Sequence, residues 1–283
     1  MLDQAAEPAA GASALPAGVF APHVSPDDSV LSRLSRSGIR TTLEQARWLL
    51  NEGVDWAHCG VLEHRTDGTP GLSPDWTQGP GAAWSEPASP AALAAAQLPP
   101  DAAACWHHQA GWVRPARLAR ALLGQPGIHW RGICAVDQLR RVEIPATAQC
   151  PAAATWQALD AQGRVLAEAP TVVIAAGAGS LALLNHRWPL QPVRGQVSWG
   201  VHADAATPLR SLIPFPANGN GNLVPRFPLG DQADGDQGWV MGSTFERDVQ
   251  ALPPTDADIH AAHATNWACL LYTSPSPRDV EES

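Results

Sequence analysis

The chain contains no lysine, and all 18 of its basic residues are arginine. A P-loop needs a Lys on the phosphates of its nucleotide, and pyridoxal phosphate chemistry needs a Lys that forms a Schiff base. Neither mechanism fits this chain. Acidic residues outnumber basic ones, and the net charge of -9 gives no overall attraction to nucleic acids or anionic membranes. Any contact with nucleic acid must therefore come from a local arginine cluster.

Long apolar runs and cysteine pairs are also missing. No run is long enough to cross a bilayer, and the first 20 residues lack the basic region and apolar stretch of a secretion signal. We therefore expect a cytoplasmic protein. The five cysteines (59, 105, 134, 150 and 269) form no C-x-x-C motif and show no zinc-type spacing to histidine, and His107 and His108 lack ligand spacing. We predict reduced, packed thiols and no metal site.

The composition that is present is that of a globular protein. Hydrophobic residues make up 45% of the 283 residues and charged residues only 16%, which argues against a disordered chain despite 24 Gly and 27 Pro. This length accommodates one large domain or two smaller ones.

Long helical patterns occur at three places. Asp27, Asp28 and Ser29 offer an N-cap for a helix whose apolar residues recur at helical spacing up to Gly53: Val30, Leu31, Leu34, Ile39, Leu43 and Leu50. A second helix begins near Pro115 and ends before Gly124. A third begins at Thr255 or Asp256 and runs to residue 268 without a C-cap.

Strand patterns occupy the second half of the chain. Short patterns at 128–133, 136–144, 155–159 and 164–167 predict an antiparallel meander, with a turn at 160–163. An apolar run at 171–176 predicts a parallel strand, and alternation in three later segments predicts another antiparallel sheet. Residues 65–104 predict long loops with one short helix at 91–96.

The last residues, CLLYTSPSPRDVEES, differ in style from the rest and hold the only Tyr beside 12 Trp. The segment resembles one reading frame of a sequencing adapter, so we expect residues 269–283 to be a non-native tail. A genuine Ser/Pro-rich tail is the alternative.

The segment TVVIAAGAGSLALL (171–184) matches a G-x-G-x-x-[G/A] motif through Gly177, Gly179 and Ala182. A nucleotide fingerprint needs a full helix behind it and an acid about 20 residues on. Here Pro189 stops the helix early, and the candidate Asp204 follows a strand broken by a glycine. Three interpretations stay open: a primary fingerprint, a plain buried strand, or a secondary contact to a cofactor held elsewhere.

Five segments resemble, in order and spacing, the FAD-dependent amine oxidase superfamily that includes glycine and D-amino-acid oxidases: GASALPAGVFAP, QAGWVRPARLARALL, VVIAAGAGS, PVRGQVSWG and WVMGSTFE. SPDDSVLSRLSRSG and CGVLEH favour the branch formed by the FAD-dependent C-terminal domains of bifunctional tRNA wobble-uridine enzymes. The resemblance implies a mixed α/β (α+β) fold. An incomplete Rossmann-like FAD-binding domain (1–50 and 105–185) would be interleaved with an antiparallel-sheet substrate domain (51–104 and 186–268).

The resemblance also implies which residues lie near FAD. Ala176 and Gly177 would make a secondary contact to FAD. Asp3 would be the acid at the end of a strand that binds the adenosine ribose of the cofactor. The small-residue loop that approaches the flavin contributes Gly11, Ala12, Ser13 and Gly18, with an ordinary loop as the alternative. Val136 aligns with the strand that touches adenine, or is plain core. The first βαβ unit of the family and a later Gly-rich contact are expected to be missing, which would weaken FAD binding.

The implied reaction moves a hydride from the carbon beside an amine to the flavin. In the tRNA branch it removes a carboxymethyl group from the wobble uridine and releases glyoxylate, and a fused methyltransferase domain completes the modification. A substrate carboxylate favours a bidentate Arg, for which Arg194 and Arg226 are candidates, against a structural role for either. The resemblance implies that His23 and Thr244 face the flavin ring, with an exposed loop as the alternative for His23.

An arginine cluster could meet tRNA phosphates, or form a solvated surface: Arg114, Arg117, Arg120, Arg131, Arg140 and Arg141. Two other hypotheses stay open for the chain: a small-molecule amine or amino-acid oxidase, and an inactive fragment.

Overall fold

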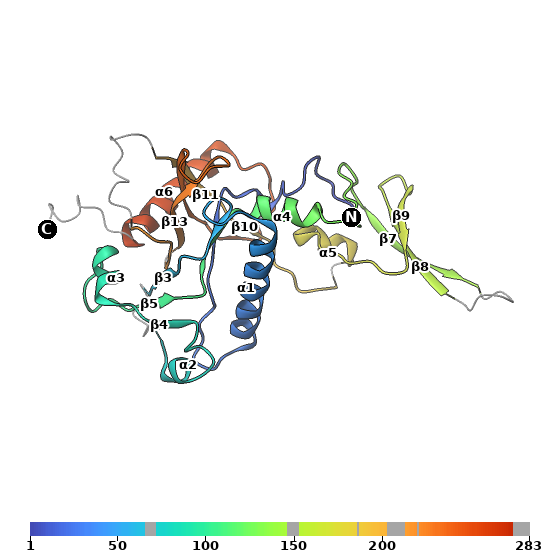
Figure 1. Ribbon diagram of the computed structural model, residues 1–283. Helices are drawn as coiled ribbons and strands as arrows, with labels where there is room; N and C mark the ends of the chain where they lie inside the picture. Colours follow the sequence, from blue (N-terminus) through green and yellow to red (C-terminus); the bar gives the residue numbers. More distant parts are fainter. Residues whose placement is uncertain (66–71, 146–152, 186, 203–212, 220, 274–283) are drawn as a thin grey trace. The chain divides into compact units, whose positions relative to one another are not determined.

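A computed structural model describes residues 1–65, 72–145, 153–185, 187–202, 213–219 and 221–273 (Figure 1). The chain divides into two compact units. Unit 1 comprises Met1–Ala12, Leu123–Arg194 and Glu246–Gln250, and unit 2 comprises Ser13–Leu122, Gly195–Phe245 and Ala251–Ser283. The mixed α/β class expected from the sequence is confirmed, with several sheets and helices among the described residues.

Unit 2 is built on a seven-stranded sheet with the order β11-β14-β13-β12-β3-β5-β4. All neighbouring strands are antiparallel except β12 and β3. The strands are β3 (Val61–His64), β4 (Ser85–Pro87), β5 (Ala104–His107), β11 (Val197–Val201), β12 (Ala217–Gly219), β13 (Gly221–Pro228) and β14 (Gln237–Gly242). The antiparallel sheet predicted for the segments after residue 193 is therefore confirmed for β11, β13 and β14.

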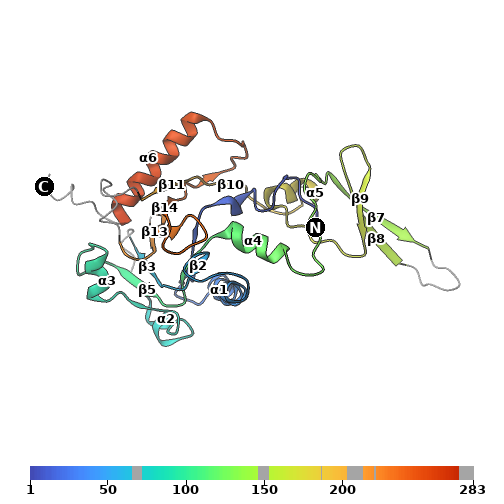
Figure 2. The same ribbon diagram turned by 45° about the horizontal axis from the view of Figure 1, so that its top comes forward.

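A second sheet and most of the helices also belong to unit 2. The sheet has the order β1-β6-β2, formed by Gly18–Phe20, Gly111–Val113 and Trp56–Ala57. The helices are α1 (Val30–Leu49), α2 (Pro74–Gln78), α3 (Pro90–Ala95), α4 (Pro115–Leu123) and α6 (Asp256–Thr273), with a short 3-10 turn η1 at Ala12–Ala14. Two residues at the ends of these elements, Ala12 and Leu123, are counted with unit 1. In Figure 2, α6 lies across β11, β13 and β14. The helix predicted at 255–268 is confirmed and continues to Thr273.

Helix α1 begins at the predicted N-cap, where the Ser29 side chain accepts a hydrogen bond from the Ser32 amide. Its predicted apolar stripe is only half correct. Ile39 and Leu43 are buried, whereas Val30, Leu31 and Leu34 are exposed. The first two turns instead bury Ser32 and Arg36, because these side chains bond to the polar loop before the helix.

Segment 65–104 holds more regular structure than the predicted loops and single helix. Within its described part lie α2, α3 and β4, and β5 begins at Ala104. Helices α2 and α3 share one local device: a serine N-cap followed by a proline at the first helical position. Strands β4 and β5 pair with each other, and β5 also pairs with β3, a contact between distant segments that local pattern does not show.

Unit 1 contains the predicted meander. Strands β7 (Gln138–Ile144), β8 (Ala153–Leu159) and β9 (Val165–Ala169) form an antiparallel sheet, within one or two residues of expectation at most ends. The turn at 160–163 lies where predicted and places Gly163 at φ +76°. The unit also holds η2 (Gly177–Gly179), α5 (Ser180–Leu183) and the two-residue pair β10 (Val193–Arg194) and β15 (Glu246–Arg247).

Two strand predictions in unit 1 are wrong. Residues 128–133 contribute only an isolated parallel bridge between Leu2 and Arg131, and Ile133 takes a positive φ of 53° that interrupts an extended run. Residues 171–176 form no strand with any described segment, and Val173 is 85% exposed. A strand needs a partner for its backbone groups, and sequence pattern alone does not say whether one is present.

The compact units follow different boundaries from the domains expected from the sequence. Helix α1 and residues 105–122 belong to unit 2 together with the seven-stranded sheet. The cofactor and substrate roles assigned to the sequence ranges stay predictions. Among the described residues, no helix combines the length and apolar character needed to cross a membrane.

Candidate functional site

Asp3 lies at the end of a short extended segment of unit 1. Its backbone amide donates to the Arg131 carbonyl (3.0 Å), and its carbonyl accepts from the Cys134 amide (2.8 Å). Its carboxylate accepts from the Ala5 amide (2.9 Å). Asp3 is partly exposed and follows Leu2, which forms a parallel bridge with Arg131. This position suits the predicted ribose contact.

The predicted glycine contacts of unit 1 are open to solvent. Gly177 begins η2 with φ +54°, and a Cβ placed on it would meet no atom within 4 Å. Ala176 is exposed beside it, and its carbonyl accepts from the Gly179 amide (3.0 Å). Gly11 is equally open and is followed by the exposed Ala12. A large cofactor can approach the backbone closely only where no side chain covers it. These residues therefore fit FAD.

Val136 and Arg194 of unit 1 are less accessible. Val136 is half-buried just before β7. Arg194 is buried and forms a bidentate ion pair with Glu246 across β10 and β15, with Nε–Oε2 and Nη2–Oε1 distances of 2.8 and 3.0 Å. The guanidinium fork that would clamp a substrate carboxylate is therefore occupied by a carboxylate of the chain itself.

Five predicted site residues lie in unit 2. Ser13 lies in η1, and Gly18 lies in β1 opposite Val113. Arg226 is an exposed residue of β13. Thr244 is held against Gln196: its amide donates to the Gln196 carbonyl (3.1 Å), and its hydroxyl accepts from the Gln196 amide (3.0 Å).

His23 is exposed but not isolated. Its amide donates to Ser35 Oγ (2.9 Å), and its Nδ1 lies 3.2 Å from Ser32 Oγ. Ser32 in turn hydrogen-bonds to Ser25 (2.8 Å), and both serines are buried. His23 therefore closes a serine network at the start of α1, which orients its ring.

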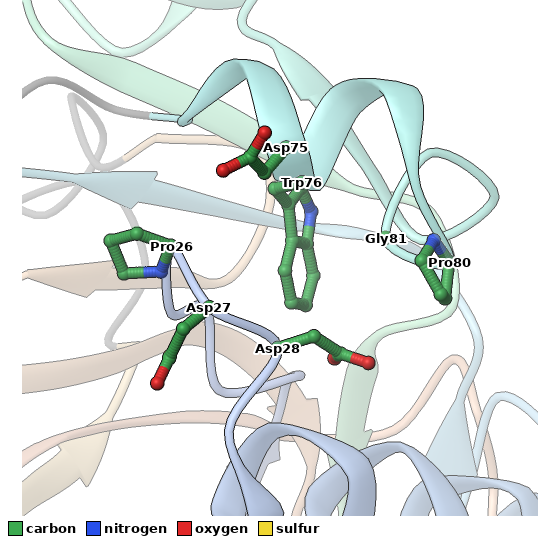
Figure 3. A pocket seen from close by; sticks show the side chains of 7 residues that line it. All are labelled: Pro26, Asp27, Asp28, Asp75, Trp76, Pro80 and Gly81. Atoms are coloured by element: carbon green, nitrogen blue, oxygen red, sulfur yellow. The ribbon is translucent and has the colours of Figure 1, made fainter.

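A cavity of about 210 Å³ lies between α2 and the loop before α1 in unit 2. Figure 3 shows the indole of Trp76 projecting toward this loop, with Pro80 and Gly81 at one side. Asp28 on the loop pairs with Arg36 (2.6 Å), whose guanidinium lies 5.1 Å from the Trp76 ring centre. None of the cofactor-binding or catalytic residues predicted from the sequence lines this cavity.

Most of the predicted arginine cluster is held by the chain itself. Arg114 donates to the carbonyls of Gly230 (2.7 Å) and Leu229 (3.0 Å), and Arg117 pairs with Asp231. Arg131, Arg140 and Arg141 bond to Leu166, Gln157 and Glu143 respectively. Arg120 is exposed at the end of α4. Contact with tRNA phosphates stays a prediction.

The structure also brings together a group that sequence reasoning did not single out. Glu63 of β3 and Cys105 and His107 of β5 place one ligating atom each within 4.8 Å of the others. Burial opposes the charge of Glu63, but the hydrogen bond and charge of His107 and the charge of Arg65 outweigh it and lower its pKa. Burial, together with the charge of Glu63, raises the pKa of Cys105 to about 12. The sequence signal was the i, i+2 spacing of Cys105 and His107 on one strand face, but the strand pairing that adds Glu63 was not visible.

Comparison with known proteins identifies the family. A family model described as FAD dependent oxidoreductase matches residues 1–283. The chain belongs to the FAD-dependent oxidoreductase family. The resemblance inferred from the sequence motifs is thereby confirmed. In two solved structures, the glycine oxidases of Geobacillus kaustophilus and Bacillus cereus ATCC 14579, the same fold recurs at TM-scores of 0.64 and 0.63 with 16% identity. The matches cover 99% and 97% of this chain and 72% and 73% of those chains.

Curated relatives of this FAD-dependent oxidoreductase are longer proteins. One from Verminephrobacter eiseniae, named tRNA 5-methylaminomethyl-2-thiouridine biosynthesis bifunctional protein MnmC, is 67% identical over 97% of this chain and 44% of its own length. A protein of the same name from Delftia acidovorans is 55% identical over 97% of this chain and 43% of its own length. The chain thus spans less than half of the relatives it matches.

Proposed function

We propose that this chain is part of an enzyme that removes the carboxymethyl group from 5-carboxymethylaminomethyl-(2-thio)uridine at the tRNA wobble position. The observation that carries the proposal is the 67% identity, over 97% of the chain, to a relative named for the biosynthesis of 5-methylaminomethyl-2-thiouridine in tRNA. Membership of the FAD-dependent oxidoreductase family supports the redox character of the step.

The proposed reaction breaks a C–H and a C–N bond. Bound FAD would supply the acceptor for a hydride equivalent from the methylene between the amine and the carboxylate. Water then adds to the oxidised carbon, the C–N bond breaks, and glyoxylate leaves, so that the wobble uridine keeps a primary amine. The protein contributes binding, orientation and exclusion of water.

The residues of the chain fit separate parts of this task. Asp3 would accept hydrogen bonds from the ribose hydroxyls, and the open backbone at Gly11 and Gly177 would let the cofactor approach. The substrate carboxylate would be bound by Arg226, because the fork of Arg194 is already paired with Glu246. His23 and Thr244 would position groups at the flavin ring, and Ala12, Ser13, Gly18, Val136 and Ala176 would line the cofactor.

The partners follow from the same proposal. The substrate would be tRNA, and we therefore propose a cytoplasmic enzyme. The relatives are called bifunctional and are more than twice as long as the matched segment, which supports a fused methyltransferase domain in the whole protein.

Nucleoside mass spectrometry tests the reaction. We expect the chain with FAD to convert 5-carboxymethylaminomethyl-2-thiouridine in isolated tRNA to the aminomethyl form and to release an equal amount of glyoxylate. The full-length Verminephrobacter eiseniae protein serves as the reference. Oxidation of free glycine or sarcosine with unchanged tRNA would instead show a small-molecule amine oxidase. Absence of flavin binding by the chain, beside a flavin-loaded reference, would show that the segment alone is inactive.

A pair of glycine variants tests the cofactor contact. Gly11→Ala adds a methyl group where the chain offers no atom within 4 Å, so folding should be unaffected while FAD affinity falls about tenfold, or about 1.4 kcal/mol. Gly230→Ala, in equally open space in unit 2, is the matched control and should bind FAD like the parent chain. Flavin fluorescence titration measures both, and equal affinities would remove Gly11 from the cofactor site.

A further inference from the structure

Three strands of the seven-stranded sheet gather polar side chains at one buried point. In the antiparallel pairing of β3 and β5, Glu63 lies directly opposite Cys105. His107 follows two residues later on the same strand face, and Ser85 of β4 lies opposite it. Cys105 and His107 are 0% exposed, and the Glu63 side chain is 12% exposed. A buried position in a sheet is usually occupied by aliphatic side chains, so the presence of Glu63, Cys105 and His107 there needs an explanation.

The spacing of the three ligating atoms fits a shared ion. His107 Nε2 lies 3.0 Å from Glu63 Oε2 and 3.8 Å from Cys105 Sγ. In tetrahedral zinc sites with metal–ligand bonds of about 2.0–2.3 Å, neighbouring ligand atoms lie roughly 3.2–3.8 Å apart. Small side-chain rotations would therefore seat one ion among the three atoms.

Outer contacts orient two of these ligands. Ser85 Oγ lies 2.7 Å from His107 Nδ1, which leaves Nε2 directed at Glu63 and Cys105. Arg65 Nη2 lies 2.7 Å from Glu63 Oε1, so that Oε2 faces the histidine. Ligating histidines commonly carry such a partner on the second ring nitrogen, and ligating carboxylates are hydrogen-bonded as well.

The donor chemistry selects among metals. A thiolate, an imidazole and a carboxylate suit Zn²⁺, whereas Mg²⁺ and Ca²⁺ prefer oxygen ligands alone. On binding, the Cys105 thiol would lose its proton to solvent, His107 would bind as neutral imidazole, and thiolate plus carboxylate would balance the ion's charge.

We propose that Glu63, Cys105 and His107 form a structural zinc site that ties β3 to β5, with water as the fourth ligand on the partly exposed side of Glu63. This site differs from the expectation of no metal that the cysteine spacing gave. It is structural because neither Cys105 nor His107 is accessible to a substrate, and it is independent of the proposed flavin reaction.

Metal analysis of the purified chain tests the site. The chain is prepared without a histidine tag, dialysed against Zn²⁺ and then freed of loose metal, and zinc is measured by mass spectrometry. We expect one zinc ion per chain, and background levels for Cys105→Ser and His107→Gln. The controls Cys59→Ser and His108→Gln change exposed residues of the same types and should keep the full amount. Removing zinc with a chelator should lower the melting temperature of the parent chain and leave that of Cys105→Ser unchanged.

A second measurement decides the matter if the buried variants fail to fold. Co²⁺ loaded into the parent chain should give a thiolate-to-cobalt charge-transfer absorption, which Zn²⁺ displaces and which Cys59→Ser retains. A parent chain that takes up no stoichiometric metal and shows no such absorption would overturn the proposal, and the cluster would then be a hydrogen-bonded network without an ion.

Discussion

Gly60 shows how a single residue without a side chain fixes the start of β3. Its φ is +77°, its amide donates to the Ala110 carbonyl (2.9 Å), and a Cβ built on it would lie 2.1 Å from Trp106 Cζ2. Gly60→Ala should therefore destabilise the chain by about 3 kcal/mol, since a left-handed conformation costs an L-residue roughly 1–2 kcal/mol and overpacking adds about 1–3 kcal/mol. Denaturant unfolding measures the loss.

Gly38 supplies the matched control. It lies exposed in the middle of α1, and a Cβ there would meet no atom within 4 Å. Gly38→Ala should stabilise the chain by about 0.5–1 kcal/mol through helix propensity. Opposite signs for the two substitutions are the expected result. A Gly60→Ala chain as stable as the parent would show that Trp106 does not pack against this backbone.

At the scale of elements, α6 is attached to the sheet by a buried polar residue. Asn266 is 2% exposed, and its Nδ2 donates to the Gln196 carbonyl (2.9 Å) and to Ser198 Oγ (3.2 Å) of β11. Asn266→Ala should destabilise the chain by about 2 kcal/mol, because it removes two hydrogen bonds of a buried side chain, each worth about 0.5–1.5 kcal/mol. Thermal unfolding checks the value. Thr265→Ala removes a neighbouring hydroxyl that donates to Ala261 of the same helix, and it should cost much less. Equal costs would contradict the docking role of Asn266.

The turn between β8 and β9 depends on a charged carboxylate. Asp160 accepts from the amides of Gln162 (3.0 Å) and Arg164 (2.9 Å) and from Arg164 Nε (2.6 Å). Desolvation opposes its charge, but the hydrogen bonds from Arg164 and Gln162 outweigh it and lower the pKa of Asp160 below its usual 3.8. The carboxylate therefore stabilises the turn above pH 3.8, and this contribution is lost as the pH falls through the folded-state pKa.

An NMR titration of the Asp160 carboxyl carbon tests this balance. The midpoint should lie below 3.8 in the parent chain and rise toward 3.8 in Arg164→Gln. Arg141→Gln removes an exposed arginine of the same sheet, whose partner is Glu143, and should leave the midpoint in place. A midpoint that stays the same in Arg164→Gln would show that the backbone amides alone lower the pKa of Asp160.

Local signals explain which elements were predictable. Ser29, Pro115 and Thr255 mark helix starts through capping or through proline at the first turn, and all three helices were found where expected. Strands depend on distant partners. Residues 171–176 have strand composition but no described neighbour, whereas β4 and β5 lie in a Pro- and Ala-rich segment and still pair.

The candidate site was also only partly predictable, because some of its contacts join residues far apart in the sequence. The prediction that no full helix follows the glycine motif is confirmed, since α5 ends at Leu183. The pairing of Arg194 with Glu246 was not visible, because 52 residues separate them and only the contact of β10 with β15 brings them together. Glu63 and Cys105 meet for a similar reason. Residue types predict chemistry, but strand register decides which of them meet.

At the scale of the whole molecule, the two units differ in how much apolar surface they bury. Among the residues that the structure describes, the three buried hydrophobic clusters, which include Leu62, Trp56 and Phe227, all lie in unit 2. In unit 1, Ile133, Val173 and Trp188 are 81%, 85% and 61% exposed. Regions with few buried apolar contacts open at lower free energy than packed cores.

Hydrogen exchange measured by mass spectrometry should therefore separate the units. Amides of β7, β8 and β9 should exchange at least about tenfold faster than those of β13 and β14, which corresponds to a difference of about 1.4 kcal/mol in opening free energy.

Addition of FAD should slow exchange in residues 1–12 and 171–179 if these segments contact the cofactor, while β13 and β14 serve as the internal reference. Equal protection throughout the chain would show that the units open together. If flavin fluorescence shows that FAD is bound, unchanged exchange in residues 1–12 and 171–179 would exclude these segments from the cofactor site.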